Sequence, residues 1–131
     1  MINLRKREGI GVNAPDTMEK QWQALWENDR QHQLLEGIQT VLKGAIEARS
    51  PQNRPPGKAG LRAEKGYYRL LYLEDVFSTR AFGRENAGRQ ALPVSWEQME
   101  EVLSQLKDIP ELQEEIRTGI ASAMDAARDD A

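Results

Sequence analysis

The middle of the chain combines basic and aromatic side chains in a pattern typical of a surface that binds nucleic acid. Lysine and arginine neutralise phosphates, and aromatic rings among them can stack on bases. Arginine outnumbers lysine here, which favours planar, bidentate contacts with phosphate oxygens. The aromatic residues of this segment are Tyr67, Tyr68, Tyr72, Phe77 and Phe82. We expect the contact to be made by eight cations, which are Arg54, Lys58, Arg62, Lys65, Arg69, Arg80, Arg84 and Arg89.

An acidic segment follows the basic one and allows two other interpretations. Residues 48–89 contain nine basic and four acidic side chains, whereas residues 90–131 contain three basic and ten acidic ones. The sequence pI is about 5.3, whereas a nucleic-acid-binding domain typically has a pI above about 9. The basic segment can therefore meet nucleic acid, an acidic surface of another protein, or the acidic C-terminal part of its own chain.

Trp22 and Trp26 are separated by one helical turn and are candidates for docking a protein partner. Tryptophan is prominent among the residues that dominate binding energy at protein interfaces. Such a pair can instead belong to the core, where Trp96 could pack beside it. We expect both rings to be mostly buried.

Several kinds of catalytic and metal site are excluded by composition. The chain has no cysteine and a single histidine, His32, so thiolate zinc sites, paired-histidine sites and the usual serine triad cannot form. The glycine-containing segment 54–60 lacks the Ser or Thr that follows the lysine of a phosphate-binding loop. We therefore expect no enzyme activity, no cofactor and no metal site.

The first expected element is a long helix over about residues 17–49. Apolar residues recur at steps of three and four from Met18 to Ile46, which places them on one face of a helix. Residues 28–33 are wholly polar, so two helices joined near Asp29 are the alternative. We expect one helix, because no glycine or proline interrupts the polar stretch.

Residues 50–60 contain three prolines and two glycines and predict a loop. A helical pattern resumes at Leu61. Residues 67–77 are rich enough in aromatic and branched residues for a buried strand. We expect a helix instead, because Leu70, Leu73 and Phe77 follow helical spacing and no second strand is evident to pair with the segment. Residues 83–89 predict a second loop.

The C-terminal part shows the strongest helix signals. Ser95 followed by Gln98 predicts a capping box, with a helix from Trp96 to about Lys107. An Asp-x-x-Glu pattern begins at Asp108 and predicts a last helix with Pro110 in its first turn. One apolar ridge should face the core from this helix, formed by Leu112, Ile116, Ile120 and Met124.

These patterns predict an all-α fold, a small helical bundle with one long N-terminal helix and three shorter helices. Residues 1–131 should form a single domain, with residues 1–14 as a mobile arm and residues 128–131 as a frayed tail. The chain has no apolar run of the roughly 18 to 20 residues needed to cross a membrane, and its N-terminus has no secretory signal. A cytoplasmic location is expected.

The expected function is that of a non-catalytic binding protein. In the leading interpretation it is a small subunit of a nucleoprotein assembly that contacts a nucleic-acid backbone through the basic middle segment. In the alternative it is a protein-binding regulator, adaptor or inhibitor without nucleic-acid contact. Both interpretations require a protein partner, and the sequence leaves a homo-oligomer open.

Overall fold

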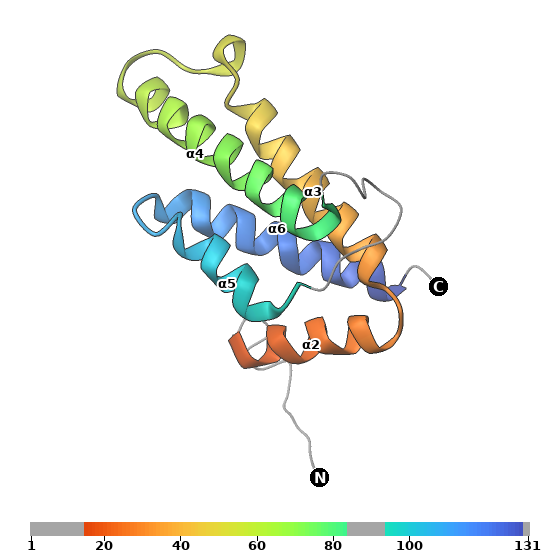
Figure 1. Ribbon diagram of the computed structural model, residues 1–131. Coiled ribbons are helices and arrows are strands. Elements are labelled where there is room, and N and C mark those ends of the chain that lie inside the picture. Colours follow the sequence, from red (N-terminus) through yellow and green to blue (C-terminus); the bar gives the residue numbers. More distant parts are fainter. Residues whose placement is uncertain (1–14, 84–93, 130–131) are drawn as a thin grey trace.

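A computed structural model describes residues 15–83 and 94–129 and shows an all-α bundle (Figure 1). The described residues contain no strand. The all-α prediction is confirmed, whereas the predicted arm at residues 1–14 and most of the predicted loop at residues 83–89 lie outside these residues. The helices are α2 (Pro15–Glu27), α3 (Gln31–Ala48), the short 3₁₀ helix η1 (Pro51–Asn53), α4 (Gly57–Phe82), α5 (Trp96–Ser104) and α6 (Pro110–Asp129).

Helix α3 is the centre of the arrangement. It packs against both α4 and α6, while α2 contacts α3, α5 and α6. Figure 1 shows α3 and α4 side by side in opposite directions, with α2 lying beneath the other helices. The candidate binding surfaces lie on the outer side of α4, at the α5–α6 turn and at the junction of α2 with α5.

The core follows the apolar spacing of the sequence. The predicted ridge of α6 is confirmed, because Leu112, Ile116, Ile120 and Met124 are all buried. The predicted helix through residues 67–77 is also confirmed, and Leu70, Leu73 and Phe77 of α4 are buried on its inner face. Burial of such apolar side chains, at about 25 cal/mol per Å² of apolar surface, is the main stabilising contribution to a bundle of this kind.

The prediction of one long N-terminal helix is wrong. The chain forms two helices there, α2 and α3, separated at residues 28–30. The longest helix is α4 with 26 residues, against 13 for α2 and 18 for α3. The alternative that placed a junction near Asp29 is the correct one.

The hydrogen bonds at this junction explain why α2 ends without glycine or proline. Asp29 has a φ of 60°, a left-handed conformation that Asn and Asp tolerate better than most residues. The N–H of Arg30 donates to the Leu25 carbonyl at 2.8 Å, and the N–H of Asp29 donates to the Trp26 carbonyl at 3.3 Å. These two bonds form a Schellman motif, which satisfies the free carbonyls at a helix C-terminus.

The predicted loop at residues 50–60 is shorter than expected, because α4 already begins at Gly57. The chain turns sharply before this helix, and a Cβ atom on Gly60 would lie 2.1 Å from the Pro55 carbonyl oxygen. Glycine at position 60 is therefore what allows the helix to begin so close to the prolines. The turn also carries internal hydrogen bonds, since the Asn53 amide donates to the Glu47 carbonyl at 2.8 Å.

The capping box predicted for α5 is confirmed. The Ser95 hydroxyl accepts from the Gln98 N–H at 3.1 Å, and the Gln98 side chain accepts from the Ser95 N–H at 2.8 Å. Helix α5 ends at Ser104, earlier than the predicted Lys107, and a turn leads to α6. Helix α6 starts at Pro110, so this proline lies in its first turn as predicted, and the helix continues to Asp129, two residues into the segment for which fraying is predicted.

Candidate binding surfaces

Three of the predicted phosphate-binding cations, all on α4, are paired with acidic residues of the α5–α6 turn and of the start of α6, and a fourth, Arg54, lies 3.8 Å from Glu64 of α4. Arg69 binds Asp108 through two nitrogens at 2.8 and 3.1 Å, and Lys65 reaches the same carboxylate at 3.1 Å. Arg62 forms a two-point contact with Glu111. Arg69 also donates to the carbonyl of Gln105. One edge of α4 is thus connected to the α5–α6 turn and to the start of α6 by ion pairs.

These pairs lower the pKa values of the two carboxyl groups. Hydrogen bonds from Arg69, and then from Lys65, hold the pKa of Asp108 well below its usual range. The hydrogen bond from Arg62 lowers the pKa of Glu111 to about 2. Both carboxylates are solvent-exposed, and pairs at such sites are individually weak. Each ion pair therefore contributes little to the stability of the fold.

We expect the melting temperature to fall as the pH is lowered from about 5 to 2. A carboxyl group whose pKa is lower in the folded state contributes stability above its unfolded pKa, near 4, and loses that contribution as pH falls toward the folded value. Replacing both Arg62 and Arg69 with glutamine should lower the melting temperature slightly at pH 7 and flatten its acid dependence. Thermal unfolding followed by circular dichroism at pH 2, 4 and 7 measures both. Identical melting curves for the variant and the parent chain at every pH would contradict the pairing.

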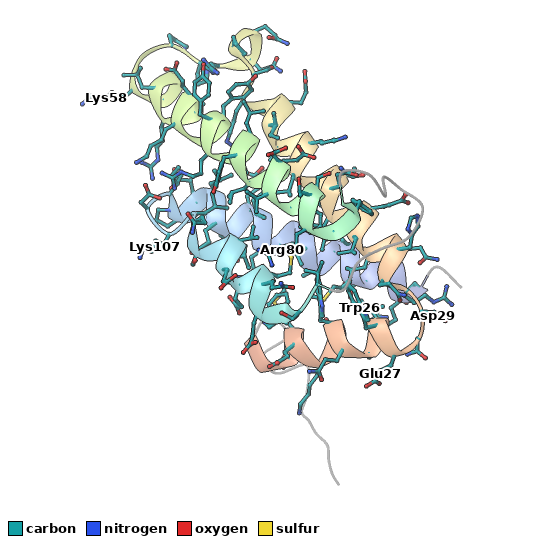
Figure 2. All side chains as sticks on the ribbon, in the orientation of Figure 1. Trp26, Glu27, Asp29, Lys58, Arg80 and Lys107 are labelled. Atoms are coloured by element: carbon teal, nitrogen blue, oxygen red, sulfur yellow. The ribbon has the colours of Figure 1, made fainter. Side chains whose placement is uncertain are left out.

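The remaining cations are divided among different environments. Arg54 donates to the Arg49 carbonyl at 2.9 Å and lies over the ring of Tyr67, 4.9 Å from its centre. Lys58 and Arg80 are exposed and form no ion pair with any described residue. Figure 2 shows Lys58 projecting from the N-terminal end of α4. The structure thus does not gather the eight predicted cations into one free surface, and Arg84 and Arg89 lie outside the described residues.

The outer side of α4 carries an apolar surface, which combines two tyrosines of the predicted nucleic-acid-binding segment with two leucines for which no role was predicted. Its four large side chains are exposed to solvent, Leu61 by 68%, Tyr68 by 60%, Leu71 by 39% and Tyr72 by 63%. Tyr68 and Tyr72 are one helical turn apart, and Leu61 lies two turns before Tyr68, so these three share one face. We call these four residues the outer α4 face. Helical spacing relative to the buried Leu70 could have revealed it.

The predicted docking pair is part of a cluster of three tryptophans. The Trp22 ring is 2% exposed and lies 5.6 Å from the centres of both the Trp26 and the Trp96 rings. Its Nε1–H donates to the carbonyl of Val94 at 2.8 Å. Burial is confirmed for Trp22, whereas Trp26 is partly exposed and packs against the core. In Figure 2, Trp26 lies on the side of α2 that faces the other helices and Glu27 on the opposite side.

A hollow of about 750 Å³ opens beside this cluster, between α2 and the start of α5. All three tryptophans border it. Among the residues that the structure describes, the charged side chains that line it are all acidic, and these are Glu19, Glu97 and Glu101. The hollow is lined by Glu19, Trp22, Gln23, Trp26, Val94, Ser95, Trp96, Glu97, Gln98 and Glu101. We call it the tryptophan hollow.

The part of the chain that the structure describes contains no metal-binding cluster and no membrane-spanning helix. Within residues 15–83 and 94–129, no three His, Cys, Asp or Glu side chains are grouped so that they could hold a metal ion. No helix in this part of the chain is long and apolar enough to span a bilayer.

Comparison with known proteins found no family model, no curated protein and no solved structure that matches the chain.

Proposed function

We propose that this chain is a non-catalytic protein-binding module that docks a partner on the outer α4 face. The observation that supports the proposal is the exposure of two tyrosines and two leucines on one helix, beside cations that pair within the chain. Exposed apolar patches on small proteins commonly mark interaction sites. Tyrosine is enriched among the residues that carry most of the energy of protein interfaces.

The charges around this face indicate the chemistry of the partner. Lys58 and Arg80 lie toward the two ends of α4, exposed and without an ion pair to a described residue, and Asp75 lies between them. This arrangement is complemented by a helix that is apolar along one side and carries carboxylates at both ends of the stretch that contacts α4. Helices commonly bind grooves and flat faces through apolar anchors at such spacing. We therefore assign an amphipathic, acidic helix of another protein as the occupant.

Photo-crosslinking tests this assignment directly. A crosslinking phenylalanine derivative at position 68, in the full chain and in nuclease-treated native lysate, should attach to one protein. The attached peptide should be an apolar segment flanked by Asp or Glu. The double substitution Tyr68→Ala and Tyr72→Ala should weaken binding of that purified partner about tenfold or more, because two interface anchors are lost. Both rings are exposed, so the fold should be unchanged.

The control variant is Lys43→Ala with Glu47→Ala. These two residues are exposed and lie one turn apart on α3. Replacing both removes one positive and one negative charge, so the net charge of the chain is unchanged. Binding should be the same as for the parent chain. Equal weakening by the control variant, or a crosslink to a basic and polar segment, would overturn the proposal.

Nucleic-acid contact through the middle segment is the second candidate. The exposed rings of Tyr68 and Tyr72 could stack on bases, and Lys58 and Arg80 are available to phosphates. Against it, Arg62, Lys65 and Arg69 already pair with carboxylates of the chain. Gel-shift titration with short DNA and RNA at about 50 mM salt separates nucleic-acid contact from protein docking, because only nucleic-acid contact predicts a shift. Even non-specific binders, with dissociation constants of about 10⁻⁴ to 10⁻⁶ M, should shift under these conditions.

A further inference from the structure

We infer that the tryptophan hollow is a second binding site, which takes a lysine or arginine side chain from a basic peptide segment of a partner protein. This site lies at the junction of α2 and α5 and uses none of the residues of the outer α4 face. The inference therefore goes beyond the proposed docking function. Three features of the hollow support it, which are its aromatic wall, its charge and its shape.

The aromatic wall is suited to a cation. Trp22 and Trp26 are stacked, with 21° between their ring planes, and Trp96 is tilted against Trp22 by 54°. Trp22 is anchored by its hydrogen bond to Val94, and the Nε1 of Trp96 donates to Glu100 at 3.1 Å. Trp26 remains partly exposed at the hollow. Tryptophan faces attract lysine and arginine more strongly than other aromatic rings do.

The charge of the described lining favours a cationic occupant over an anionic one. Glu19, Glu97 and Glu101 line it, and none of them forms an ion pair with a residue that the structure describes. Glu100 differs, since it lies 3.8 Å from Arg117 and accepts from Trp96. Elsewhere in the bundle, acidic residues such as Asp108 and Glu111 are matched by arginines. The hollow thus holds three carboxylates that are available to a cation from outside.

The shape of the hollow favours a peptide over a small molecule. Its volume of about 750 Å³ lies within the range of about 300 to 1,000 Å³ found for ligand sites. Within the described residues it is bounded by two elements, α2 and the segment from Val94 to Glu101, and these leave it open along one side. An extended chain can lie in such a groove while one side chain reaches the tryptophans. Two or three carboxylates along the rim then meet neighbouring basic residues of the same peptide.

Tryptophan fluorescence offers a direct test. The chain's three tryptophans all border the hollow, so an occupant should change the emission of the full chain. The probe is a short peptide of alternating glycine and arginine, and its matched control replaces each arginine with citrulline, which keeps the shape and removes the charge. We expect saturable quenching or a shift with the arginine peptide and none with the citrulline peptide. Equal responses to both peptides, or no response at millimolar peptide, would overturn the inference.

Two sets of variants locate the effect. Glu97→Gln with Glu101→Gln should weaken arginine-peptide binding about fivefold, as expected for the loss of two exposed ion pairs. The control Glu47→Gln with Glu114→Gln changes net charge equally at exposed positions outside the hollow and should leave affinity unchanged. Equal weakening by both variants would show a long-range charge effect and contradict the assigned site. Tyr68→Ala with Tyr72→Ala should bind the peptide normally, which separates this test from that of the outer α4 face.

The chain's own N-terminal cations are the competing occupant. Arg5, Lys6 and Arg7 form a basic cluster in the sequence. If they fill the hollow, the arginine peptide will bind only after all three are replaced by glutamine, and a partner peptide is then ruled out. Equal binding to the parent chain and to this variant is the result we expect.

Discussion

Replacing Trp22 with alanine is expected to lower the free energy of unfolding by about 3 to 5 kcal/mol. The ring is almost fully buried and contacts two other indoles, so its removal leaves a large cavity at the junction of α2 and α5. The substitution also leaves the carbonyl of Val94 without its donor, which adds the cost of an unsatisfied buried acceptor. Urea unfolding followed by far-ultraviolet circular dichroism measures the effect without relying on tryptophan emission.

Two comparison variants make this result interpretable. Trp22→Phe keeps an aromatic ring but loses the bond to Val94, so it should be destabilising by an intermediate amount, about 1 to 3 kcal/mol. Tyr68→Ala removes a large ring from an exposed position and should change stability by no more than about 0.5 kcal/mol. A cost below about 1 kcal/mol for Trp22→Ala would contradict its place in the core, because such values are typical of surface substitutions.

The contrast between Trp22 and Trp26 shows what the sequence could predict about docking residues. Their spacing places them on one side of a helix, and this side does face the bundle. Which of the two rings is covered depends on Trp96 of α5 and on Val94 just before this helix, which lie about 70 residues further along the chain. Such long-range packing leaves no signal in local spacing. The hollow beside the rings could not be predicted for the same reason.

The break between α2 and α3 leaves no glycine or proline in the sequence, but the phase of the apolar spacing indicates it. On one continuous helix, with about 3.6 residues per turn, the buried residues of α2 would lie on nearly the opposite side from those of α3. A second signal is the pair Asn28 and Asp29. Both side chains can bond to nearby backbone groups, and the Asn28 amide does donate to the Ala24 carbonyl at 2.8 Å. Residues of this kind favour helix ends over helix interiors.

The charge layout of the sequence indicates which regions of the chain pair, but not which residues. Pairing of the basic middle segment with the acidic C-terminal part was one of three interpretations, and the structure shows it for Arg62, Lys65 and Arg69. Their partners are 39 to 49 residues away for the two arginines. The sequence could give the sign and the approximate regions of this pairing. The individual pairs depend on how α4 crosses the α5–α6 turn, which only the fold determines.

Two glycines provide the last prediction, because they should respond to the same substitution in opposite directions. Gly44 lies on the exposed side of α3 with no atom within 4 Å of an added Cβ. Gly44→Ala should raise the free energy of unfolding by about 0.5 to 1 kcal/mol, the usual gain when glycine is replaced in a helix interior. Gly119 of α6 is different, since its added Cβ would lie 2.5 Å from a Cγ atom of Val41 on α3.

Gly119→Ala should therefore be destabilising by about 1 to 2 kcal/mol, as overpacking in a close contact outweighs the gain in helix propensity. Val41 cannot move aside cheaply, because a β-branched side chain has one strongly preferred rotamer in a helix. The clash could be relieved only if α3 and α6 moved apart. The two helices are also close at a second point, where a Cβ atom on Gly37 of α3 would lie 3.2 Å from the Cβ of Ala123 of α6. Chemical denaturation of both variants should show a difference of roughly 1.5 to 3 kcal/mol between them. If Gly119→Ala stabilises the chain as much as Gly44→Ala does, then α3 and α6 do not pack as closely as this structure shows.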